Sequence, residues 1–200
     1  MTEDDKKLMD ALPWIAKKIR QYKEDIEEHL IPIESTEEYA DKIIQLRKAR
    51  RLIYERLDRD GVEYVLTSEE KESGIFQRKI DCAVKLQAEF RGFFSSNDTF
   101  EIRLTEPAVL EWQKKLLRQT GKQRVDAAEL KKLLKKLYIG EWDSCYENRD
   151  YLDGEGWKVI LEFADGQKKE IHGYMKCPYN FDKLRKWLYR QTDGSKTAFR

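Results

Sequence analysis

The spacing of the apolar residues changes near residue 61, and this change constrains the fold more than any other feature of the sequence. Up to that point apolar residues recur every three or four positions, which is typical of helices packed along a seam. Beyond it, several stretches alternate between apolar and polar residues, as half-buried strands do. The sequence therefore predicts an α+β protein. We expect an N-terminal antiparallel helical hairpin over 1–60, a compact domain with antiparallel β-hairpins and three or more helices over 61–190, and a flexible tail over 191–200.

The N-terminal hairpin is predicted from two apolar seams. The first consists of Leu8, Leu12, Ile15, Ile19, Tyr22 and Ile26, and the second of Tyr39, Ile43, Leu46, Ile53 and Leu57. Pro13 interrupts the first seam, so we expect a short helix near 3–10 and a longer one over 13–30. The segment Ile31-Pro32-Ile33 should end that helix, Ser35 and Glu38 have the spacing of a capping box, and Asp60-Gly61 should close the second helix. Three roles are open to the first seam: packing on the second helix, dimerisation, or receiving a partner helix.

Alternation predicts four strands in the second part of the chain. Two lie at 80–90 and 100–104, with a turn over 95–98 between them. Two more, at 157–163 and 168–174, flank the hairpin turn Asp165-Gly166, and a two- or three-residue loop leaves their register open. The segment 62–67 is a candidate edge strand, and 68–73 is expected to be a polar loop.

Three helices are expected among these strands. One covers 106–119, starting at Thr105 and stopping at Gly121. Another, over 127–137, has Asp126 as its cap and a buried stripe of Leu130, Leu133, Leu134 and Leu137. The last follows Pro178, with Asn180 as its cap and Phe181, Leu184, Trp187 and Leu188 buried.

The formal net charge is only +1, but charge is segregated within the chain. Residues 108–137 are strongly basic and 138–172 are acidic. The candidate partner-binding residues are all cationic: Arg47, Lys48, Arg50, Arg51, Lys114, Lys115, Arg118, Lys131, Lys132, Lys135 and Lys136. The last seven would lie on the two helices of 108–137. Those helices could contact phosphates, or their lysines could simply be the polar faces of amphipathic helices.

Catalytic chemistry is not indicated by the sequence. It contains no G-x-S-x-G, H-E-x-x-H or C-x-x-C motif, and a Cys177–His172 pair is better explained as a buried thiol and a surface imidazole. A zinc site from Cys145, His172 and Cys177 lacks a fourth ligand and ligand-like spacing. The acidic residues Asp143, Glu147, Asp150, Asp153 and Glu155 lack the spacing of a calcium loop. We therefore expect no catalytic residue, no cofactor and no metal.

The location of the protein is predicted from its cysteines and its hydropathy. Three cysteines at wide spacings do not suit a disulfide framework and favour a reducing cytoplasm. No apolar run approaches the length of a membrane span, and we expect no signal peptide.

Several residues over about 125–190 resemble an uncharacterised family of small bacterial α+β domains. They are Trp142, Tyr146, Asp153-Gly154, Trp157, Gly173 and Pro178-Tyr179-Asn180-Phe181, in a pattern W…Y…DG…W…G…YP-x-NF. Met175 and Cys177 stand where that family would carry Asn and Tyr. The resemblance implies the fold and a bacterial or mobile-element origin, and no reaction.

The sequence thus favours a non-enzymatic binding protein: a regulator or inhibitor that docks on a larger protein or ribonucleoprotein. A homodimer through the N-terminal helices is compatible with this interpretation. The alternative is a nucleic-acid-binding accessory protein that uses the basic segment 108–137, and the third class is an enzyme of unknown type.

Overall fold

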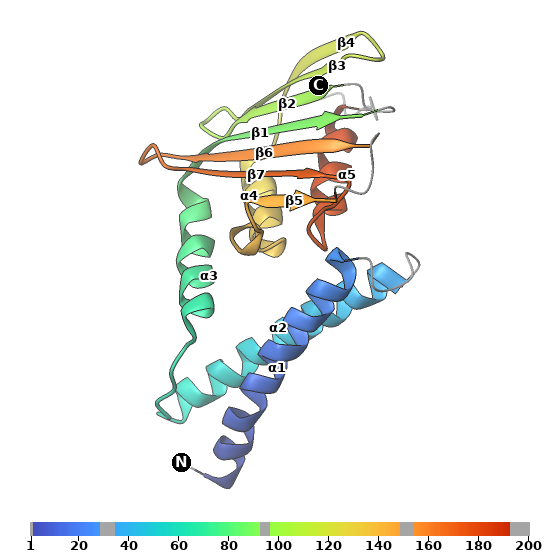
Figure 1. Cartoon of the computed structure of the whole chain (residues 1–200). Coiled ribbons are helices and arrows are strands. Elements are labelled where there is room, and N and C mark those ends of the chain that lie inside the picture. The colour runs from blue at the N-terminus through green and yellow to red at the C-terminus, as the bar shows by residue number, and fades with distance from the viewer. Residues whose placement is uncertain (1, 29–34, 93–96, 149–153, 193–200) are drawn as a thin grey trace. The chain divides into compact units, whose positions relative to one another are not determined.

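The computed structural model describes residues 2–28, 35–92, 97–148 and 154–192 (Figure 1). The chain divides into two compact units, Met1–Ser68 and Glu69–Arg200. The described residues form five α-helices and one seven-stranded sheet, which confirms the predicted α+β class.

The first unit is the predicted helical hairpin, formed by α1 (Glu3–Glu27) and α2 (Thr36–Arg59). The first seam is used within the unit, because its isoleucines are buried together with Ile43 and Leu57 of α2. Tyr22 and Tyr39 meet edge to face with ring centroids 5.0 Å apart. Gly61, with a φ of +66°, follows α2 as expected for a residue just past a helix end.

Two predictions about the ends of these helices were wrong. Pro13 lies inside one continuous α1 rather than between two helices. Proline in a helix interior costs about 3 kcal/mol. The seam is buried at Ile15, Ile19 and Ile26 after the proline and half-buried at Leu8 and Leu12 before it, and this burial offsets the cost. Ser35 makes no side-chain cap hydrogen bond. A capping box exists instead at α1, where Thr2 Oγ1 accepts from the Asp5 backbone N–H at 3.2 Å and the Thr2 N–H donates to Asp5 Oδ2 at 2.6 Å.

The second unit is built on a sheet with the strand order β4-β3-β2-β1-β6-β7-β5. Neighbouring strands are antiparallel except β5, which runs parallel to β7. The strands are β1 (Ala83–Arg91), β2 (Asp98–Arg103), β3 (Val109–Lys114), β4 (Gln119–Arg124), β5 (Cys145–Glu147), β6 (Gly156–Phe163) and β7 (Lys168–Tyr174).

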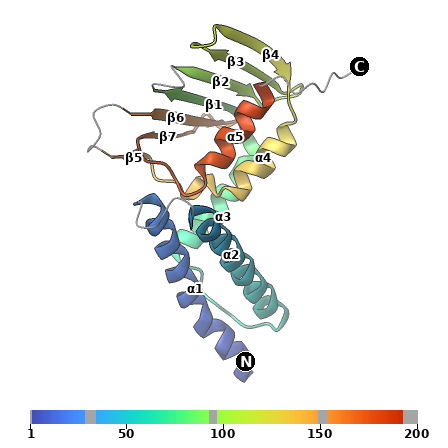
Figure 2. The same cartoon turned by 90° about the vertical axis from the view of Figure 1, so that its right-hand side faces the viewer.

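Helices α4 (Ala127–Lys136) and α5 (Phe181–Thr192) cover one face of this sheet, and the other face is open (Figures 1 and 2). The core lies between the sheet and these helices. The predicted stripes are confirmed: Leu130, Leu134, Leu137 and the four apolar residues of α5 are buried, and Leu133 packs against the core. The cap at Asp126 is also confirmed, since its carboxylate accepts from the backbone N–H groups of Ala128 and Glu129.

The predicted helix over 106–119 is wrong, and the segment forms the β3–β4 hairpin instead. The apolar residues of 109–112 fit both helical and strand periods, so local pattern alone does not decide between them. Long-range pairing decides: Leu110 is opposite Ile102 of β2, and Trp112 is opposite Gly121 of β4. Gly121 therefore lies inside a strand, beneath the Trp112 indole, rather than at a helix end.

The segment 62–73 also differs from the prediction. Residues 62–67 form no strand, and 68–73 belong to a helix, α3 (Ser68–Lys79), rather than a polar loop. α3 is fixed by Phe76, whose ring meets that of Phe163 edge to face at 5.6 Å. Ile80 and Cys82 form a 3₁₀ turn that leads into β1, so the predicted strand begins only at Ala83.

The β6–β7 hairpin is confirmed, and its loop is the longer of the two alternatives. Glu162 pairs with Lys168, and Val159 with Ile171. The Phe163 N–H donates to the Gln167 carbonyl at 3.0 Å, which leaves three residues in the loop. The predicted segments Ile31-Pro32-Ile33, Ser95-Ser96 and 193–200 lie outside the described residues.

The residues that carry the family resemblance are structural where they are described. Trp142, Tyr146, Trp157 and Phe181 are buried. Asn180 directly precedes α5, at the position predicted for its cap, and its side chain links two elements of the core. Its Oδ1 accepts from Trp142 Nε1 at 3.0 Å, and its Nδ2 donates to the Leu137 carbonyl at 2.8 Å.

Candidate functional site

The open face of the sheet contains a shallow hollow of about 790 Å³, lined by side chains of β1, β2, β3, β4 and β6. Most of its charges are paired across the strands, and Glu89 is paired with Arg91 of the same strand. The pairs on this face are Lys85–Glu101 (2.9 Å), Arg103–Glu111 (2.8 Å), Lys122–Glu111 (2.8 Å), Lys158–Glu170 (2.6 Å) and Lys168–Glu162 (2.8 Å). The hydrogen bond from Lys122 is the main cause that lowers the pKa of Glu111. A face with alternating, paired charges is suited to contact with water and lacks the single-signed field that attracts phosphates.

The basic residues of 108–137 do not form the continuous helical stripe that the sequence suggested. They are divided between the β3–β4 hairpin and α4. Lys114 is 3% exposed, and its Nζ lies 5.2 Å from the centroid of the Tyr189 ring. Lys131 Nζ donates to the Asp81 carbonyl at 2.8 Å, and Lys135 Nζ lies 2.7 Å from the Asp81 carboxylate. Lys132 and Lys136 are exposed on α4.

The cationic cluster of the first unit is also divided. Arg47 is only 5% exposed, so it belongs to the hairpin interior rather than to a contact surface. Arg50 is half-buried, while Lys48 and Arg51 are exposed. Arg51 forms an ion pair with Glu55 at 3.3 Å, one helical turn further along.

An apolar feature that the sequence interpretation missed lies at the turn between β3 and β4. Leu116 and Leu117 are 61% and 59% exposed, and the exposed cations Lys115 and Arg118 flank them. We call these four residues, Lys115 to Arg118, the leucine tip. In a helix these leucines would have faced a core, and only the strand pairing puts them at a hairpin end. The flanking strands pair up to Lys114 and Gln119, which fixes the position of the tip.

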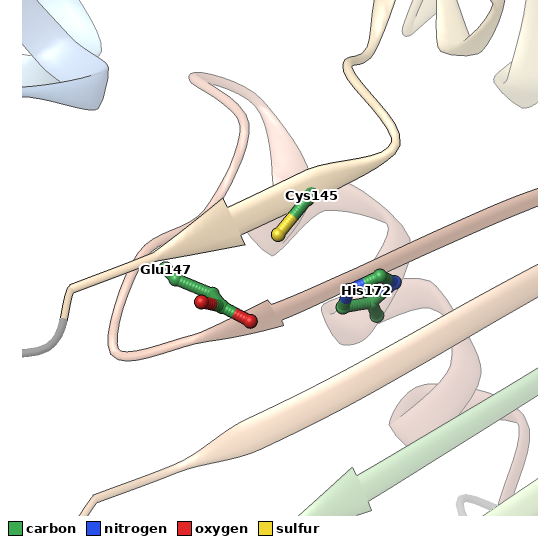
Figure 3. A group of neighbouring side chains, drawn as sticks. All are labelled: Cys145, Glu147 and His172. Carbon is green, nitrogen blue, oxygen red and sulfur yellow. The ribbon is translucent and has the colours of Figure 1, made fainter.

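A second feature lies at the opposite end of the sheet, where β5 joins β7 (Figure 3). Cys145 and His172 are directly opposite each other in the register of these strands. Glu147 lies two residues after Cys145, and side chains two apart on a strand share a face. One potential ligand atom from each of Cys145, Glu147 and His172 lies within 4.8 Å of the others, and all three side chains are exposed. The Cys-x-Glu spacing was the available sequence signal, and it identifies neither the partner strand nor His172.

The structure does not bring together the zinc ligands considered from the sequence. Cys145 and His172 are neighbours, but Cys177 packs against the core. Burial is the main cause that raises the pKa of the Cys177 thiol from 9.0 to about 12. At neutral pH this thiol is therefore protonated and a poor nucleophile.

The predicted acidic loop is only partly described. Glu155 is engaged with Arg185, with 2.8 Å between Oε2 and Nη1. The Asp143 N–H donates to the Tyr146 hydroxyl. Asp150 and Asp153 lie outside the described residues. Of the five carboxylates, only Glu147 contributes to a group with other metal-ligating side chains in the part of the chain that the structure describes.

Among the described helices, none combines the length and the apolar character that crossing a bilayer requires. Comparison with protein-family models, with curated proteins and with solved structures found no match.

Proposed function

We propose that this chain is a non-enzymatic binding protein, a regulator or inhibitor that docks on a larger protein through the leucine tip. The observation that carries the proposal is the exposure of Leu116 and Leu117, side by side at the end of a paired β-hairpin. Adjacent exposed leucines are costly to leave in water unless a partner covers them. The cations on either side favour a partner whose apolar pocket has an acidic rim.

The contribution of the leucine tip to the free energy of binding can be calculated from the leucine surface that a partner would bury. Complete burial of a leucine side chain is worth about 1.5–3 kcal/mol, so covering two that are already partly shielded should contribute about 2–3 kcal/mol. That corresponds to roughly 30- to 150-fold in affinity. Because paired strands hold the tip, little ordering entropy is lost when it docks.

The test compares affinity purification from host cells for three forms of the chain: wild type, L116S/L117S and V65S. Val65 is the matched control, because it is 87% exposed but lies far from the tip in sequence. We expect a protein that wild type and V65S retain and the tip variant loses, with its dissociation constant then raised roughly 30- to 150-fold. The same set of retained proteins for all three forms, or none, would contradict the proposal.

Nucleic-acid binding through residues 108–137 has less support, because Lys114 is buried and Lys131 and Lys135 are bonded to Asp81. A salt titration separates the two functions. Contact with phosphates should weaken steeply with salt and disappear on charge reversal of Lys132 and Lys136. Docking of the leucine tip should survive moderate salt, since apolar burial is not screened.

The remaining parts of the proposal concern assembly and location. Multi-angle light scattering tests whether a second copy pairs through the α1–α2 hairpin, in which case the mass doubles. Cys82, Cys145 and Cys177 form no disulfide bond with one another, which supports a cytoplasmic location. A bacterial or mobile-element origin is supported only by the resemblance over about 125–190.

A further inference from the structure

We propose that Cys145, Glu147 and His172 form a Zn²⁺ site at the β5–β7 edge of the sheet. Cys145 and His172 occupy the same position in a parallel strand pair, and Glu147 follows on the same face. Strand pairing thus holds three ligand-bearing positions at fixed separations, and one donor atom from each already lies within 4.8 Å of the others (Figure 3).

The three donors together select for zinc among the common cations. Thiolate, imidazole and carboxylate are all established Zn²⁺ ligands, and Mg²⁺ and Ca²⁺ prefer sites made only of oxygen. A thiolate and a carboxylate also supply two negative charges, so the bound divalent ion would be neutralised with a neutral imidazole. Three protein ligands leave the fourth tetrahedral position to water.

The three donor atoms need to move only a short distance toward one another to bind a metal ion. Zinc–ligand bonds of about 2.0–2.3 Å in a tetrahedron place the donors roughly 3.3–3.8 Å apart. The present separations of up to 4.8 Å are therefore about 1.5 Å too long at most. All three side chains are exposed, so rotation about their χ angles can close the site without moving the core.

The neighbouring charges are compatible with a bound cation. Lys158 of β6 is opposite His172 in the strand register, but its ammonium is held by Glu170 at 2.6 Å. The charge of Lys158 is thereby compensated rather than directed at the metal.

A bound metal would also act on the fold. β5 has only three residues and forms the edge of the sheet. A ligand pair from β5 with one from β7 would link the two strands, and an ion that binds only the folded chain raises its stability. Zinc should therefore raise the melting temperature of the wild type.

The experiment measures zinc and cobalt binding to the full chain after removal of metal with a chelator. Wild type is compared with C145S, H172A and the control C82S, since Cys82 is an exposed free cysteine elsewhere. We expect one equivalent of Zn²⁺ per wild-type chain and a thiolate-to-cobalt charge-transfer band with Co²⁺. C145S and H172A should bind more weakly by more than the roughly 10- to 100-fold that loss of an outer-shell partner costs. C82S should bind as wild type does.

Circular dichroism establishes that each variant is folded before its affinity is compared, which is expected because both altered ligands are exposed. The proposal is overturned if wild type takes up no stoichiometric zinc or if C145S retains the zinc affinity of wild type. It is also overturned if C82S loses as much zinc affinity as C145S. A cobalt complex without the thiolate band would likewise overturn it. Zinc should raise the melting temperature of wild type and C82S, and an equal rise in C145S would count against the site.

Discussion

The indole of Trp157 on β6 lies across Gly173 on β7, so closely that a Cβ on Gly173 would be 2.5 Å from Trp157 Cε2. The two residues are opposite each other in the strand register. The same relationship recurs in the β3–β4 hairpin, where a Cβ on Gly121 would be 2.0 Å from Trp112 Cζ2. In both hairpins a large aromatic ring fills the space left by the missing side chain of its cross-strand neighbour.

This arrangement predicts that Gly173→Ala destabilises the second unit. The added methyl group must displace a buried indole, and overpacking of this kind costs about 1–3 kcal/mol. Gly156→Ala is the matched control, since its Cβ would meet its nearest neighbour at an ordinary 3.7 Å. Chemical denaturation should show a lower free energy of unfolding for G173A than for wild type, and a much smaller change for G156A. Equal losses would mean that glycine at these positions matters only for the backbone.

The hydrogen bonds of Asn180 predict a pH-dependent variant. In Asn180→Asp, a carboxylate would face the Leu137 carbonyl, to which Asn180 Nδ2 now donates at 2.8 Å. Losing that donor in a buried site should cost about 1–3 kcal/mol at pH 7. The repulsion favours the protonated acid, so its pKa should be raised in the folded state. The loss in free energy of unfolding relative to wild type should therefore be smaller at pH 5 than at pH 7. Urea denaturation at these two pH values measures it. A deficit that is independent of pH would contradict this assignment.

The Cys177 thiol predicts a dependence of stability on alkaline pH. Its pKa is raised, chiefly by burial, from 9.0 to about 12, so the unfolded chain releases this proton first. The contribution of this thiol to the free energy of unfolding is complete below about pH 9. It falls by up to about 1.4 kcal/mol per pH unit as the pH rises toward 12. Denaturation between pH 8 and 11 should give a shallower decline for Cys177→Ala than for wild type.

The control for this comparison is Cys82→Ala, because Cys82 is exposed. Its pH profile should parallel that of wild type. The pKa of Tyr189 is also raised by burial and by its hydrogen bond to Asp98, and its contribution cancels because it is present in all three proteins. A decline in C177A as steep as in wild type would refute the prediction.

Alanine substitutions at the two cap positions of the first unit, Thr2 and Ser35, should differ in their effect on stability. Thr2→Ala removes an observed capping box and should cost about 0.5–2 kcal/mol. Ser35→Ala removes no cap hydrogen bond and should leave the stability of the hairpin nearly unchanged. Thermal unfolding followed by helical circular dichroism measures both, and a larger loss in S35A than in T2A would reverse the assignment.

The elements that can be predicted from the sequence are those whose apolar spacing fits only one period. The apolar seams of 8–26 and 39–57, the stripe after Asp126 and the alternation around Asp165-Gly166 each predicted an element that the structure contains. The seam also identified Ile15, Ile19 and Ile26, which are the apolar residues that α1 buries, although Pro13 suggested a break. In these segments the burial pattern that tertiary packing needs is the one that local spacing displays.

Long-range pairing determines the elements that local spacing leaves open. Residues 109–112 fit both periods, and only pairing with β2 and β4 made them a strand, which moved Leu116 and Leu117 from a predicted helix to an exposed tip. The meeting of Cys145 with His172 depends on a parallel register between strands that are distant in sequence. Such a register is set by the whole sheet and its packing against the helices, and no local window of sequence contains it.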